Sequence, residues 1–187
     1  MADKLQHTNS QFKKELDKCR ELFVKKLKDY GPAWRIMRPS SLTDQILIKA
    51  NRIRSIEIKQ EAMVDEGIYP EFQGIVNYGV IALIQLELGF ADQTDIDADK
   101  ALELYDKYVN VSLELMKRKN HDYDEAWRAM RVSSYTDLIL MKIYRTKEIE
   151  GNDGHTLVSE GVDANYMDMI NYSVFALIKM DEANGAF

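Results

Sequence analysis

Two pairs of basic residues recur at the same spacing in this chain. Lys49 and Arg52 end the segment "TDQILIKANR", and Lys142 and Arg145 end the segment "TDLILMKIYR". Such a pair suits a phosphate group, because lysine offers a point charge and arginine a planar fork of donors. On a helical wheel both cations fall on the flank of the apolar stripe, where they can also lay their alkyl stems on the core and pair with acids. A phosphate pocket and structural ion pairs are therefore both retained as interpretations.

A tryptophan followed by an arginine precedes each of these segments. The candidate contacts to a nucleotide in these loops are Trp34, Arg35, Arg38, Trp127, Arg128 and Arg131. An indole ring can stack on a nucleobase while a neighbouring arginine faces the phosphates. The alternative is that each tryptophan is a hydrophobic plug between its loop and the rest of the protein.

Acidic residues in both halves are candidates for holding Mg²⁺, which takes oxygen ligands and bridges carboxylates to phosphate oxygens. These candidates are Asp44, Glu57, Glu66, Asp137, Glu150, Glu160 and Asp168. Asp168 lies three residues before Asn171, so both are expected on one face of a helix. Gly74 stands where Asp168 would be in the other half. Any metal chemistry is therefore expected to depend more on the second half.

The chain is a tandem duplication. The segment "DYGPAWRIMRPSSLTDQILIKANR" at Asp29 returns as "DYDEAWRAMRVSSYTDLILMKIYR" at Asp122, an offset of 93, and "NYGVIAL" at Asn77 returns as "NYSVFAL" at Asn171, an offset of 94. Internal repeats of this kind determine the architecture. We expect residues 1–90 and 99–187 to form two helical repeats, joined by a linker at 91–98, in one compact pseudo-symmetric domain.

Each copy is predicted to contain three helices. Apolar residues recur at three- and four-residue steps between residues 10 and 30, and comparable patterns cover 99–123, about 40–60 and 134–150. The Ser and Thr of "SSLTD" are expected to cap the second helix. The last helix is apolar nearly all round, which predicts a central position. Asn77 and Asn171 in that helix are therefore expected to be buried and to bond another helix. The predicted fold is an all-α, pseudo-two-fold helical bundle.

Composition excludes several functional classes. The 187 residues carry a formal net charge of −6, whereas proteins that bind nucleic acid usually present a basic face. Nucleic acid is therefore not the expected partner. A single cysteine rules out a disulfide framework and a cysteine-based zinc site. The amino-terminal residues are polar, and the longest apolar stretch is too short to span a bilayer. We expect a cytoplasmic protein without a membrane partner.

These motifs resemble a known family. The order of Lys-Asp-Tyr-Gly, Trp, Arg, Thr-Asp, Lys and Arg, followed by Asn-Tyr in an apolar helix, resembles the bacterial and phage nucleotide modification associated domain. The resemblance covers both copies, although the second has His-Asp-Tyr-Asp at the first of these places. That family in turn looks related to the all-α nucleoside triphosphate pyrophosphohydrolases of the MazG and dimeric dUTPase type. The resemblance implies a MazG-like helical bundle, a nucleotide or nucleotide-like ligand, Mg²⁺ as cofactor and, since those enzymes are often dimeric, a homodimer.

The chain also departs from the pyrophosphohydrolases. They carry a Glu-x-x-Glu pair on one helix and a Glu-x-x-Asp pair on the next, whereas this chain has Lys49-x-x-Arg52 and Lys142-x-x-Arg145 at the first place. Only Asp168 followed by Asn171 is similar to the second pair. Lysine and arginine can neutralise phosphate but cannot ligate a metal ion. The resemblance therefore implies nucleotide binding by this chain more strongly than it implies hydrolysis. Two hypotheses result: a nucleotide-binding protein with pyrophosphohydrolase activity, or a non-catalytic helical module held by inter-helix ion pairs.

Overall fold

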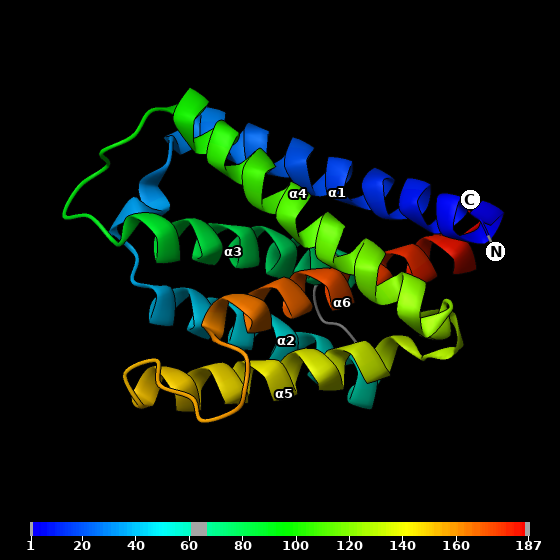
Figure 1. Ribbon diagram of the computed structural model, residues 1–187. Helices are drawn as coiled ribbons and strands as arrows, with labels where there is room; N and C mark the ends of the chain where they lie inside the picture. Colours follow the sequence, from blue (N-terminus) through cyan, green and yellow to red (C-terminus); the bar gives the residue numbers. More distant parts are fainter. Residues whose placement is uncertain (1, 61–66, 186–187) are drawn as a thin grey trace.

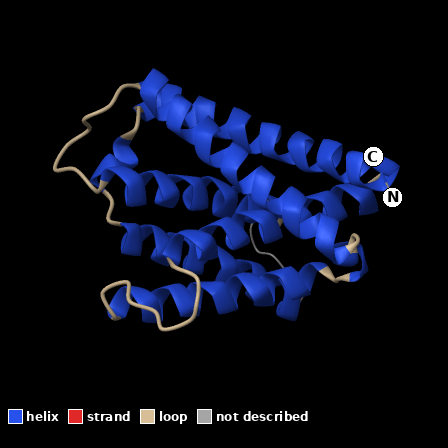
Figure 2. Ribbon diagram, in the orientation of Figure 1, coloured by secondary structure: helices blue, strands red, loops and turns tan. Residues whose placement is uncertain are grey.

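The computed structural model describes residues 2–60 and 67–185, and within them helices joined by loops make up the chain, with no strand (Figure 2). The six α-helices are α1 (Ala2–Tyr30), α2 (Pro39–Lys59), α3 (Tyr69–Leu88), α4 (Ala98–Tyr123), α5 (Val132–Gly151) and α6 (Val162–Ala183). Short 3₁₀ helices, η1 (Ala33–Ile36) and η2 (Ala126–Ala129), carry the two tryptophans. The predicted all-α fold with three helices per copy is confirmed.

The helices form three layers of two. Helices α1 and α4 make one outer layer, α3 and α6 the middle layer, and α2 and α5 the other outer layer (Figure 1). Each layer pairs one helix with its counterpart from the other copy. The middle layer is the most buried, because α3 and α6 are apolar on nearly every side and contact both outer layers. The central position predicted for the last helix of each copy is therefore correct.

Reciprocal contacts between α2 and α5 show the pseudo-two-fold relation. The hydroxyl of Thr43 donates to Glu150 at 2.8 Å, and that of Thr136, its counterpart, donates to Glu57 at 2.9 Å. A contact between residue i and residue j that is mirrored from j to i marks a two-fold interface. The two helices run antiparallel (Figure 1), so the start of each lies beside the end of the other. The two copies thus pack like the subunits of a dimer.

The middle layer depends on a close approach of its two helices. A Cβ atom at Gly79 in α3 would lie 2.7 Å from a side-chain carbon of Ile170 in α6. Asn77 and Asn171 are 8% and 4% exposed, and their amides donate at 3.1 Å to the carbonyl oxygens of Cys19 and Ser112 on the outer helices. The expectation that both asparagines are buried and tie helices together is confirmed.

Two local expectations differ from the structure. Helix α1 begins at Ala2 rather than near residue 10, and this early part is held because the Thr8 hydroxyl donates to Glu125 at 2.6 Å. The serines do not cap α2 or α5. The threonines do not cap them either, since the N-cap residues are Arg38 and Arg131 and neither makes a side-chain cap bond. Helix α2 already begins at Pro39, whose missing N–H costs nothing in the first turn.

Candidate functional site

Each copy contains a cleft built from equivalent positions. The second cleft lies between α4, η2, α5 and α6 and has a volume of about 310 Å³, and the first lies between α1, η1 and α3 with about 320 Å³. Equivalent residues lining the two clefts are Lys26 and Lys119, Tyr30 and Tyr123, Trp34 and Trp127, Asn77 and Asn171, and Tyr78 and Tyr172. Aromatic and apolar side chains dominate both linings, which share a lysine and an asparagine as polar groups, and the second lining also contains Asn120 and Asp168. Such a composition is typical of small-molecule sites.

The tryptophans are packed into the bundle and also line the two clefts. Trp34 and Trp127 are 7% and 6% exposed, and Trp127 stacks on Phe175 with ring centroids 4.5 Å apart. They are therefore packed between loop and bundle, as a plug would be. Each also lines its cleft, and neither indole Nε1 has a hydrogen-bond partner among the described residues. Buried N–H groups are rarely left unpaired in proteins, so these two require an explanation.

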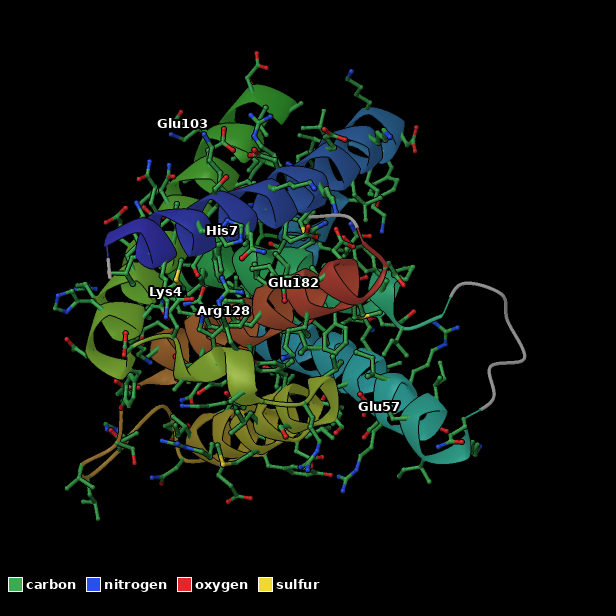
Figure 3. The ribbon with its side chains drawn as sticks, turned by 90° about the vertical axis from the view of Figure 1, so that its right-hand side faces the viewer. Lys4, His7, Glu57, Glu103, Arg128 and Glu182 are labelled. Atoms are coloured by element: carbon green, nitrogen blue, oxygen red, sulfur yellow. The ribbon has the colours of Figure 1, made fainter. Side chains whose placement is uncertain are left out.

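Arg35 and Arg128, the arginines that follow the tryptophans, are occupied by the protein itself. The Arg35 guanidinium is 2% exposed and bonds Asp95 of the linker twice, at 2.7 and 2.9 Å. This pairing lowers the pKa of the Asp95 carboxyl below its usual value, chiefly through the hydrogen bonds from Arg35. Arg128 bonds Glu182 at 2.9 Å and Thr8 at 2.7 Å (Figure 3). Both guanidiniums fasten loops and helix ends rather than facing a cleft.

The exposed arginines, Arg38 and Arg131, sit at the amino-terminal ends of α2 and α5. The Arg38 guanidinium lies over the ring of Phe90, 5.6 Å from its centroid. Neither of the two arginines is among the residues that line the clefts described above.

The basic pair of the first copy faces one acid. Lys49 and Arg52 both bond Glu71, Lys49 at 3.3 Å. The Lys49 chain passes over Gly74, where a Cβ would lie only 2.5 Å from its Cε. A larger residue at this position would have to displace the Lys49 chain, which fills the space of a side chain.

In the second copy the acid that faces the cations is Asp168, about one helical turn after the position that corresponds to Glu71. Asp168 is 3% exposed, and its two oxygens accept from Lys119 at 2.6 Å and from Lys142 at 2.7 Å. Arg145 makes no ion pair with any residue that the structure describes. The position that corresponds to Glu71 is Asn165. Each copy therefore keeps one buried acid for its cations, at different positions of the same helix face.

The remaining metal candidates lie apart from Asp168. Glu57 and Glu150 occupy opposite ends of the α2–α5 pair, and Figure 3 places Glu57 on α2, away from Arg128. Burial raises the pKa of both carboxyls above the usual value. Asp44 pairs with Lys147 and Asp137 lies 3.9 Å from Arg54, while Glu160 is exposed and Glu66 lies outside the described residues. Within residues 2–60 and 67–185, no three acidic, histidine or cysteine side chains come together as a metal site.

Several cleft residues were not among the site candidates chosen from the sequence, although Tyr30 and Tyr78 stand within the quoted repeats. Lys26, Tyr30 and Tyr78 have identical counterparts in the second copy, which is a signal that a systematic comparison of the copies detects. Their convergence on one cleft becomes visible only when three helices are packed together.

These features define a class of protein: an all-α bundle built from two copies of a three-helix unit, each with an aromatic cleft. The family model for nucleotide modification associated domain 1 matches residues 26–86 and 119–180, so the chain belongs to that family. No curated protein and no solved structure matches the chain significantly. None of the described helices is both long and apolar enough to cross a membrane.

Proposed function

We propose that this protein binds nucleotides, with the base held in the aromatic clefts. The observation that carries the proposal is the pair of tryptophan N–H groups, which are buried, line equivalent clefts and have no partner among the described residues. A heteroaromatic base offers ring acceptors for such a donor and flat faces for the neighbouring tyrosines. At about 310 and 320 Å³ the clefts are at the small end of ligand sites, which suits a base rather than a whole triphosphate.

Charge beside each cleft supports a phosphorylated ligand. In the first copy Lys49 and Arg52 supply two positive charges against the single Glu71, which leaves +1. In the second copy the equivalent cations Lys142 and Arg145 stand with the single acid Asp168, which again leaves +1. Each lining adds one further lysine, Lys26 or Lys119. Phosphate attraction therefore survives although the cations are engaged by acids.

The test uses the two tryptophans as built-in reporters, since the chain has two and each lines one cleft. In Trp34→Phe the fluorescence reports the second cleft, and in Trp127→Phe the first. We expect saturable fluorescence changes on titration with the common nucleoside triphosphates. If both variants keep their helical circular dichroism and neither responds to any nucleotide, the proposal is wrong.

Pyrophosphohydrolysis is the finer hypothesis, and it needs carboxylates that hold Mg²⁺ around the phosphates. The described residues do not fit this need, because the acids are dispersed and both oxygens of Asp168 bond lysines. We therefore propose binding without turnover and treat hydrolysis as a prediction of the family resemblance. Incubation of each nucleoside triphosphate with the protein and Mg²⁺, followed by measurement of released pyrophosphate, separates the two. Turnover by the parent protein would support the enzymatic hypothesis, and its loss in an Asp168→Asn variant that circular dichroism shows to be still folded would assign Asp168 to it.

A further inference from the structure

Equivalent asparagines in the two clefts differ in how completely they are bonded. In the first copy the Asn77 amide donates to Cys19, and its Oδ1 accepts from the hydroxyl of Tyr105 at 2.7 Å. In the second copy the Asn171 amide donates to Ser112 in the same way. Its Oδ1, however, is buried and finds no partner in the described part of the chain.

The difference between the two asparagines arises from a single hydroxyl group. Tyr105 lies on α4 and reaches the asparagine of the other copy, and the residue at the corresponding position of α1 is Phe12. Phe12 is fully buried with its ring against Phe175, at 5.3 Å between centroids, but it has no group to donate. The Asn171 oxygen is therefore an acceptor that the fold leaves unused, and a buried acceptor without a partner is unfavourable.

The same cleft holds an unused donor. Trp127 Nε1 has no partner within the described residues, and both Trp127 and Asn171 line the second cleft with at most 6% of their surface exposed. The first cleft offers the Trp34 donor alone, since Asn77 is fully bonded. Lys119 of the second cleft already bonds Asp168, whereas the Trp127 N–H and the Asn171 oxygen have no partner within the described residues.

We infer that the second cleft selects its base by hydrogen bonding, whereas the first accepts aromatic rings without this selection. The ligand of the second cleft is a heteroaromatic base with an N–H group for Asn171 Oδ1 and a ring acceptor for Trp127 Nε1. This inference rests on the proposed nucleotide binding and adds to it which copy is specific and which atoms it uses. An unpaired buried polar group discriminates strongly against a ligand that lacks the matching atom.

The experiment compares nucleosides with analogues that lack the N–H group. Adenosine is paired with purine riboside, cytidine with its 4-deamino analogue, and uridine with N3-methyluridine. Each is titrated into Trp34→Phe, which reports the second cleft, and into Trp127→Phe, which reports the first. We expect the second cleft to prefer the N–H form of the nucleoside that it binds by about tenfold, the value of one good hydrogen bond. The first cleft should bind both forms with affinities within about twofold of each other, because stacking on aromatic rings does not depend on the N–H group.

A substitution far from the ligand's other contacts supplies the second test. Phe12→Tyr, introduced into Trp34→Phe, restores the hydroxyl that the other copy uses at Tyr105. We expect it to bond Asn171, to raise the melting temperature without ligand, and to remove the tenfold preference in the second cleft.

The outcomes separate the inference from the function on which it rests. Nucleosides that bind the second cleft equally with and without the N–H group overturn the inference and leave nucleotide binding intact. A preference that Phe12→Tyr leaves unchanged in a folded protein also overturns it. If neither cleft responds to any nucleoside or nucleotide, both proposals are wrong. If Phe12→Tyr does not fold, the nucleoside pairs in Trp34→Phe decide the question alone.

Discussion

The Asp168→Asn substitution tests how the second copy is held together. It preserves the shape of the side chain but removes the charge that faces Lys142, in a pair whose side chains are 4% and 8% exposed. The lysine is then left as a buried cation without a counter-charge, because its neighbour Lys119 is also positive. Breaking one partner of a buried pair costs about 3–5 kcal/mol of the free energy of unfolding. For a chain of this size, that lowers the melting temperature by roughly 6–20 °C.

The matched control is Asp106→Asn. Asp106 bonds Arg20 at 2.7 Å, but both side chains are 40% exposed, so the loss should be about 0–1 kcal/mol. Urea unfolding followed by far-ultraviolet circular dichroism measures both variants. Adding Lys142→Met to Asp168→Asn removes the stranded cation, and part of the lost stability should return. Should Asp168→Asn cost no more than Asp106→Asn, the pair is not the buried contact that we describe.

Three further substitutions probe other contacts. Tyr105→Phe removes the donor to the Asn77 oxygen and should cost about 1–3 kcal/mol in urea unfolding; no loss would show that this hydrogen bond is unimportant. Burial raises the pKa of Glu150, so the native state binds more protons than the unfolded state and stability falls as pH rises through the native pKa. Glu150→Gln should therefore raise the melting temperature at neutral pH and lose this advantage in mild acid, and a constant difference would contradict the burial effect. Gly79→Ala should destabilise by about 1–3 kcal/mol because its Cβ would lie 2.7 Å from α6, whereas Gly151→Ala meets no atom within 4 Å and should be neutral or stabilising.

The duplication and the helical periodicity could be predicted from the sequence because both are patterns along the chain. The offset of 93 to 94 residues predicted a pseudo-symmetric pair, and the apolar surroundings of Asn77 and Asn171 predicted their burial. Helix termini were less predictable. Thr8 holds the early turns of α1 through a residue more than a hundred positions away, Glu125, which no local pattern reveals.

The partners of the charged and polar groups were decided by the tertiary structure. Lys49, Arg52 and Lys142 were recognised as a repeated set, but whether they meet phosphate or carboxylate depends on how α3 and α6 pack beside them. The difference in hydrogen bonding between the two clefts likewise depends on the tertiary structure. It arises because Tyr105 reaches the asparagine of the other copy while Phe12 has no hydroxyl to offer. Periodicity determines which face a residue occupies, whereas the atom it meets there is determined by packing between segments distant in sequence.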